Sequence, residues 1–126
     1  MEPIIIREKI SPAELIRIVR EGYYGSADMA KAAVDVERGV LALGGEWHSD
    51  AEEVLTADGS DAREVWGVNF YPWREPRERI VYTSLINLKP LVPHRKMEIT
   101  DVERRKQIHE IVTVLLLHDD ETLPAE

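Results

Sequence analysis

The sequence predicts a single α+β domain in which packed helices cover a four-stranded, mainly antiparallel sheet. Two observations predict this class. Three segments begin with the side-chain pattern that caps a helix, and two pairs of segments are rich in residues that favour strands. Along the chain they follow the order α-β-β-α-β-β-α without a linker or repeat between them. We expect the domain to span residues 1–118 of the 126, and the acidic segment 119–126 to be frayed.

Each predicted helix begins at a Ser or Thr that is followed three residues later by Glu, the pattern of a capping box. The first helix extends to Tyr23 or Tyr24, and the second ends at Asp58-Gly59. The third ends in Val114 to Leu117, which is apolar almost all round and predicts deep docking or a subunit contact. The capping patterns are Ser11 to Glu14, Ser49 to Glu52 and Thr100 to Glu103.

Two pairs of strands separate these helices. Residues Ala30 to Val36 alternate with period two, and Val40 to Leu43 returns after Gly39, which predicts a hairpin with Gly at a position of positive φ. The second pair, Val65 to Tyr71 and Ile80 to Leu88, is rich in aromatic and β-branched residues. Two prolines in the segment between them rule out a tight two-residue turn.

The composition excludes several classes of function. A formal net charge of −8 disfavours DNA or RNA as a partner, because nucleic-acid binding needs Lys and Arg to replace condensed counterions. The absence of cysteine excludes a disulfide scaffold, a thiolate zinc site and a Cys nucleophile, and it fits a reducing compartment. No segment reaches the roughly 20 apolar residues that span a bilayer. The N-terminus lacks a signal-peptide pattern, so we expect a cytoplasmic protein without a membrane partner.

The densest chemistry lies in the segment Gly44 to Glu53. If residues 46–48 stay extended, the side chains of Glu46 and His48 point to the same side, and Asp50 follows at the start of the second helix. A His flanked by carboxylates can bind a divalent metal or act as a tuned general base. The plainer interpretation is that Asp50 interacts with the helix dipole and that His48 bonds a backbone carbonyl.

The second pair of strands carries two asparagines. On the first strand, Gly67, Asn69 and Tyr71 share the face opposite the core-facing residues, and on the second strand Asn87 and Lys89 take the corresponding place. Asn is a poor strand former, and in such a position it often makes a structural hydrogen bond or lines a pocket. Solvent exposure is the alternative for each.

A basic cluster surrounds the prolines that follow the last strand. Arg95 can grip a carboxylate or phosphate through both arms of its guanidinium, with Lys89, His94 and Lys96 beside it. This arrangement predicts an anion site, and the alternative is a solvated loop.

Four segments combine motifs that no common fold demands together: Gly44-Gly45-Glu46-Trp47-His48-Ser49-Asp50-Ala51-Glu52, Asp58-Gly59-Ser60, Val65-Trp66-Gly67-Val68-Asn69-Phe70-Tyr71-Pro72 and Ser84-Leu85-Ile86-Asn87. With these segments the chain resembles a family of small prokaryotic proteins of unknown function, and the likeness extends from about Ile10 to the third helix. The resemblance implies no activity. It implies that the Glu, His, Asp and Asn candidates above fall inside motif segments, and that Arg stands in the family where this chain has Lys89.

Two functions are consistent with these patterns. In the first, which we favour, the protein is a binding domain whose polar pocket holds a small molecule or a divalent metal. Its metal ligands are Glu46, His48 and Asp50, and its further ligand-binding residues are Asn69, Asn87, Tyr71, Lys89 and Arg95. In the second, the protein is a non-catalytic module that binds a protein partner or forms a homodimer, through the apolar end of the third helix and an exposed Trp73.

Overall fold

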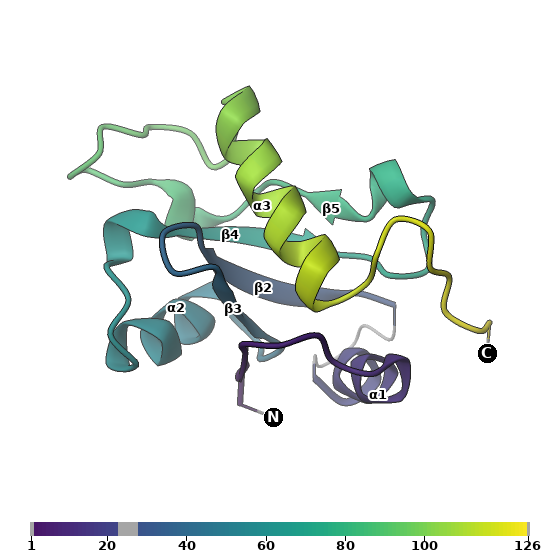
Figure 1. Ribbon diagram of the computed structural model, residues 1–126. Coiled ribbons are helices and arrows are strands. Elements are labelled where there is room, and N and C mark those ends of the chain that lie inside the picture. The colour runs from purple at the N-terminus through teal and green to yellow at the C-terminus, as the bar shows by residue number, and fades with distance from the viewer. Residues whose placement is uncertain (1, 23–27, 126) are drawn as a thin grey trace.

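The computed structural model describes residues 2–22 and 28–125, which form a five-stranded antiparallel sheet with helices on both faces (Figure 1). The strands lie in the order β1-β3-β2-β4-β5. They are β1 (Ile4–Ile6), β2 (Ala30–Asp35), β3 (Val40–Leu43), β4 (Val65–Phe70) and β5 (Ile80–Val81). The α-helices are α1 (Pro12–Gly22), α2 (His48–Ala57) and α3 (Val102–Leu115), and the short 3₁₀ helices are η1 (Ala62–Glu64), η2 (Pro76–Glu78) and η3 (Leu85–Asn87). The predicted α+β class and antiparallel sheet are confirmed, with one strand more than predicted.

The additional strand is β1. It pairs antiparallel with β3, so that Ile4 lies opposite Leu43 and Ile6 opposite Leu41. Its three isoleucines favour a strand, but three residues are too few to show period-two alternation. The chain therefore begins with a strand, and the predicted order that starts with a helix is wrong.

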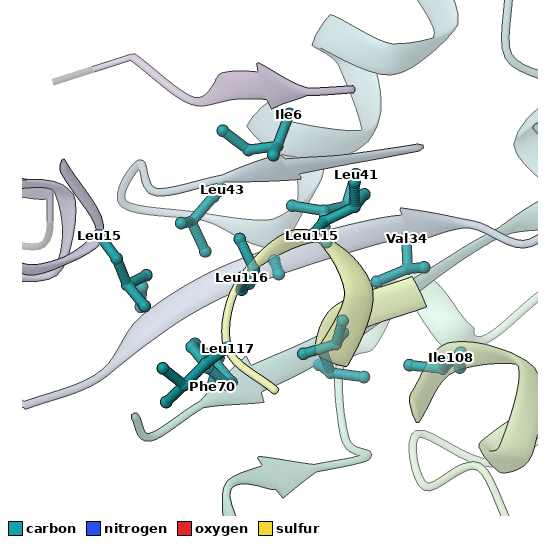
Figure 2. Close-up of a cluster of buried hydrophobic side chains, with 14 of the residues drawn as sticks. Ile6, Leu15, Val34, Leu41, Leu43, Phe70, Ile108, Leu115, Leu116 and Leu117 are labelled. Atoms are coloured by element: carbon teal, nitrogen blue, oxygen red, sulfur yellow. The ribbon is translucent and has the colours of Figure 1, made fainter. Parts of the chain in front are cut away.

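The two faces of the sheet bury different clusters, because successive strand residues point to opposite sides. On one face Val34 and Leu41 belong to the larger cluster, which α1 and α3 cover; Figure 2 shows Leu15 of α1 and Ile108 of α3 in it. On the other face the strands pack Ala33, Ala42 and Val65 against Ala51 and Leu55 of α2. This second face is the one that carries Asn69 and Gly67, which share the alternation of Val65 along β4.

The predicted hairpin between β2 and β3 is confirmed. Asp35 lies opposite Val40, and the backbone N–H of Gly39 donates to the Asp35 carbonyl at 3.0 Å. Gly39 has φ of 69°, a left-handed conformation that glycine adopts at little cost. The Asp35 carboxylate also accepts bonds from the backbone N–H groups of Glu37 and Arg38, both at 2.9 Å, which fixes the turn.

The helix starts follow the capping prediction in one case of three. The Ser11 hydroxyl accepts from the Glu14 N–H at 3.1 Å, as predicted. α2 starts one residue before the predicted Ser49 cap, so its N-cap is Trp47, whose side chain makes no capping bond to the described residues. At α3 the capping carboxylate belongs to Asp101, one residue after the predicted Thr100. The second helix ends at Ala57 with Asp58 as its C-cap, which matches the predicted end at Asp58-Gly59. The predicted end of the first helix, Tyr23 or Tyr24, lies outside the described residues.

The last predicted strand is mostly wrong. β5 covers Ile80–Val81 of the predicted Ile80 to Leu88. After it the Ser84 hydroxyl accepts from the Ile86 N–H at 3.3 Å and starts η3. Residues 82–101 then form a long irregular connection to α3, the green loop that extends past the start of β4 in Figure 1.

The C-terminal segment packs onto the domain, where the sequence suggested a frayed end. Leu123 is buried, and the indole N–H of Trp73 donates to the Pro124 carbonyl at 2.9 Å, so Trp73 is half-buried rather than an exposed contact residue. Arg79 is 3% exposed, and its guanidinium donates to three backbone carbonyls, those of Arg74 (3.1 Å), His118 (3.1 Å) and Glu121 (2.7 Å). These bonds tie the β4–β5 loop to the end of the chain.

The apolar end of α3 docks deeply into the domain, which was one of the two predicted alternatives; the other was a subunit contact. Leu115, Leu116 and Leu117 are buried in the larger cluster, while Val114 is exposed.

Within residues 2–22 and 28–125, no helix is long and apolar enough to cross a membrane.

Candidate functional site

Two glycines between β3 and α2 place His48 over the sheet. Gly44 and Gly45 have φ of 99° and 85°, which lets the chain leave β3 and enter the helix within a few residues. A Cβ on Gly45 would lie 2.7 Å from the Cγ of Pro3, so glycine also admits the N-terminal segment. His48 is the first residue of α2 and lies on the face of the sheet that carries Asn69.

The imidazole of His48 is held by the sheet. Its Nε2 lies 2.8 Å from the Val68 carbonyl oxygen, and a carbonyl only accepts, so Nε2 carries the proton. Burial lowers the pKa of His48 below its usual value, and the charge of Lys31 lowers it further. The bond to the Val68 carbonyl and the nearby Asn69 side chain raise the pKa without offsetting these effects. The ring is therefore neutral at neutral pH.

The site predicted around His48 is assembled in part. The Asn69 side chain reaches the imidazole closely enough to affect its pKa, although the buried Oδ1 of Asn69 makes no well-directed hydrogen bond within the described part of the chain. The Glu46 side chain is exposed, and its backbone carbonyl accepts from Lys31 Nζ at 2.7 Å. Asp50 lies half-buried in the first turn of α2. Over the described ranges, no three His, Asp or Glu side chains are placed to hold a metal ion, so the predicted Glu46, His48 and Asp50 ligand set has no structural support.

Asn87 makes structural hydrogen bonds, one of the two roles that the sequence left open for it. It is fully buried in η3, and its Oδ1 accepts from the backbone N–H of Gly67 at 2.8 Å. Its Nδ2 donates to the carbonyl of Gly67 at 3.0 Å and to that of Met97 at 2.9 Å. All these bonds go to the main chain, so they give no support to a site that Asn87 would share with His48.

The carboxamide of Asn87 replaces a missing strand. β5 pairs with Asn69 and Phe70 of β4 and then departs, which leaves the backbone of Gly67 at an open edge. An amide side chain presents the same donor and acceptor as a peptide group and bonds both groups of Gly67. Glycine permits the close approach, because a Cβ at residue 67 would lie 2.6 Å from the Ser84 Cβ and 2.8 Å from the Ile86 Cγ1.

Two other predicted ligand residues, Tyr71 and Arg95, lie apart from a recognisable site. The Tyr71 ring stacks against Arg74, whose guanidinium carbon lies 3.6 Å from the ring centre. Arg95 is exposed on the β5–α3 connection and makes no hydrogen bond or ion pair with any residue that the structure describes.

Lys89 is the predicted residue that the structure places in a pocket. The pocket has a volume of about 220 Å³ and lies between α2, η1 and the β5–α3 connection. The Lys89 Nζ donates to the Ala62 carbonyl at 2.8 Å and lies 3.4 Å from a carboxylate oxygen of Glu52. We call this the Lys89 pocket; its lining residues are Glu52, Ala62, Arg63, Ile86, Leu88, Lys89, Pro90 and Leu91.

The ammonium of Lys89 is buried with incomplete compensation. The residue is 7% exposed, and burial lowers the pKa of Lys89 below its usual value. Glu52 opposes this shift, while the nearby charge of Arg104 adds to it. The neighbouring cation, Arg63, already pairs with Asp61 at 2.7 Å. The pocket thus combines apolar walls with an ammonium whose carboxylate partner lies at the long end of hydrogen-bond distance.

Most residues of this pocket were not among the predicted site residues. Glu52 was assigned to a helix cap that the structure lacks, and its carboxylate faces Lys89 instead. The available signal was Leu85, Leu88 and Leu91, which recur every three residues in a segment that ends in prolines. Leucines at that spacing do not suit a strand with one buried face, and they indicated an irregular, exposed apolar segment.

The pKa of His48 leads to a pH prediction. An unfolded His has a pKa near 6.5, and the folded value is lower, so the unfolded chain binds more protons once the pH falls below about 6.5. We expect the free energy of unfolding to keep its highest value above that pH and to decrease as the pH falls toward the pKa of His48 in the folded protein. Urea denaturation should show a steeper decrease for the wild type than for His48→Gln, whose amide N–H can still donate to Val68. His118→Gln, at an exposed position, is the control, and equal slopes for the wild type and His48→Gln would refute the assignment.

Similarity to known proteins assigns no activity to the chain. No curated protein and no solved structure matches the chain significantly. The family model DUF5674, described as a protein of unknown function, matches residues 4–115. This match covers β1 through the end of α3 and thus nearly the whole fold. The chain is therefore a member of the DUF5674 family of proteins of unknown function.

Proposed function

We propose that the protein is a binding module that docks an acidic, apolar segment of a partner protein on the β5–α3 connection. The observation that carries this proposal is the distribution of exposed apolar side chains. Among the residues that the structure describes, seven large apolar side chains are exposed, and five belong to residues 85–102. These are Leu85 (70% exposed), Leu88 (44%), Leu91 (80%), Met97 (43%) and Val102 (76%). Such a concentration is typical of a surface that binds a partner.

Pocket lining and backbone contacts bring four of these residues close together. Leu88 and Leu91 both line the Lys89 pocket. The backbone N–H of Leu88 donates to the Leu85 carbonyl at 3.1 Å, and the Met97 carbonyl accepts from the Ser84 N–H at 3.1 Å, which brings Met97 beside the start of η3. We call Leu85, Leu88, Leu91 and Met97, together with the Lys89 pocket, the docking face.

The charge of this region selects the partner. Residues 82–106 contain six Lys or Arg and three Asp or Glu, a net charge of +3 in a chain whose net charge is −8. Opposite charges across an interface speed association and exclude wrong partners. A partner segment that pairs Asp or Glu with aliphatic residues complements both properties of the docking face.

The shape of the docking face favours a protein over a membrane. Leu88 and Leu91 line a concave pocket, which can receive a single inserted side chain. The Lys89 ammonium points inward to Ala62 and Glu52, whereas a lysine that binds lipid headgroups keeps its charge at the surface. The acidic remainder of the chain also repels an anionic bilayer.

A peptide selection tests the proposal. A random peptide library displayed on phage is selected against the wild type, against a triple variant with Leu85→Ser, Leu88→Ser and Leu91→Ser, and against Val114→Ser, which changes an exposed residue outside the docking face. We expect the wild type and Val114→Ser to enrich sequences that combine Asp or Glu with aliphatic residues. The triple variant should not enrich them.

Three results contradict the proposal. The first is no enrichment by the wild type, or the same enrichment by the triple variant. The second is cosedimentation of the wild type, but not the triple variant, with phosphatidylserine vesicles, which assigns the face to a membrane. The third is a dimer in gel filtration that the triple variant dissociates, which assigns the face to a second copy of the chain.

A further inference from the structure

We infer that the Lys89 pocket binds a carboxylate that is carried beside a branched aliphatic group. This inference deepens the proposed function, because the pocket belongs to the docking face. Two sources supply this chemistry: a small free carboxylic acid, or the C-terminal carboxylate of a polypeptide that ends in an aliphatic residue. The experiment below distinguishes them.

The size and walls of the pocket determine the aliphatic part of the ligand. The pocket measures about 220 Å³, below the roughly 300–1,000 Å³ of sites that hold a drug-sized molecule. Its apolar lining comes from Ile86, Leu88, Pro90 and Leu91, with Ala62 beside them. A single branched side chain fits such a volume, and burying it removes apolar surface from water on both partners.

The bonding of Lys89 determines the charged part. An ammonium has three N–H donors. One donates to the Ala62 carbonyl at 2.8 Å, and the nearest carboxylate, Glu52, lies at 3.4 Å, longer than a good charge-assisted hydrogen bond. No other hydrogen-bond acceptor in the described residues takes a proton of this nitrogen, and the Trp66 ring, whose centre lies 5.2 Å away, offers a weaker cation–π contact. An ammonium buried to this degree needs fuller compensation. A ligand carboxylate in the pocket supplies the missing acceptor and charge.

Glu52 acts as the ligand's competitor. Its carboxylate is the present counter-ion of Lys89, yet a quarter of its side chain is exposed, so it can turn toward water. An incoming carboxylate then replaces Glu52 beside the ammonium. Neutralising Glu52 therefore strengthens ligand binding, whereas a Lys89–Glu52 pair that serves structure alone predicts no such gain.

Aspartate and glutamate side chains within a polypeptide fit the pocket less well. Their carboxylates extend from the same side chain that would have to fill the apolar part. A C-terminal Leu or Val instead carries its carboxylate and its aliphatic side chain on one Cα, and 4-methylpentanoate holds the same two groups on a short chain. The requirement for both groups within one small volume makes the pocket selective.

NMR titration and fluorescence polarisation test the inference. The probes are 4-methylpentanoate, an acidic peptide that ends in Leu with a free carboxylate, and the same peptide with a C-terminal amide. Lys89→Met should weaken binding of the carboxylates at least about tenfold, the loss expected for one hydrogen bond to a charged group. Glu52→Gln should tighten it. Arg77→Ala, which changes an exposed cation of η2 outside residues 82–106 and outside the pocket, should leave it unchanged.

Each outcome decides between the alternatives. Binding of 4-methylpentanoate without the peptide assigns a small acid, and binding of the free peptide in preference to its amide assigns a C-terminus. The inference is overturned if neither carboxylate binds, if the amide binds equally well, or if Glu52→Gln weakens binding. If Lys89→Met does not fold, the Glu52→Gln and amide results decide. Peptides selected on the docking face that bind regardless of their C-terminus would refute this inference and leave the proposed function intact.

Discussion

Replacing Asn87 with alanine lowers the free energy of unfolding by about 3 kcal/mol or more, because it leaves three main-chain groups without a partner at a cost of about 1–3 kcal/mol each. The groups are the N–H and carbonyl of Gly67 and the carbonyl of Met97. The site is fully buried, so water cannot replace the carboxamide without entering the fold. Urea denaturation of the wild type and Asn87→Ala measures the difference.

Asn69→Ala is the matched control for this prediction. Asn69 lies two residues from Gly67 on β4, but its buried Oδ1 makes no hydrogen bond to the described residues. Removing an amide that is already incompletely bonded costs less than about 1 kcal/mol beyond its packing. Similar losses for the two variants would show that Asn87 is not the residue that completes the edge of β4.

The parts of the fold that were predictable from the sequence are those that local interactions determine. The hairpin at Gly39 follows from period-two alternation and one residue that tolerates positive φ, and both are visible in a window of a few residues. The cap at Ser11 is likewise a bond between residues three apart. The prediction was wrong where tertiary contacts decide. β1 is a three-residue strand that is held by its pairing with β3. The chain can leave the sheet after Val81 because the Asn87 side chain bonds the backbone of β4 in place of β5.

The same distinction applies to the candidate site. The approach of Asn69 to His48 follows from alternation along β4 and from the glycines that precede α2, and the sequence predicted it. The Lys89 pocket instead depends on contacts to Glu52 and Ala62, which are 37 and 27 residues away along the chain. No periodicity or motif spacing reports such contacts, so Lys89 was predicted without the residues that surround it.

Gly67→Ala should destabilise the protein by about 2–3 kcal/mol, the upper range for overpacking a tight contact. The added Cβ would lie 2.6 Å from both the Cβ and the Oγ of Ser84 and 2.8 Å from the Ile86 Cγ1, so η3 has to move away from β4. Urea denaturation again gives the free energy. Gly59→Ala is the control, because it adds a Cβ at φ of 108° with no atom within 4 Å and so tests backbone strain without a clash.

A double-mutant cycle separates the clash from the hydrogen bonds it disturbs. Ser84→Gly removes two of the three close atoms, so Gly67→Ala should cost less in that background. Gly67→Ala and Asn87→Ala should be less than additive, because either change alone detaches η3 from the edge of β4. Full additivity would mean that the two residues act independently. Since η3 begins with Leu85 and leads into Leu88 and Lys89, its detachment should also weaken peptide binding to the docking face, and the Gly59→Ala control should not.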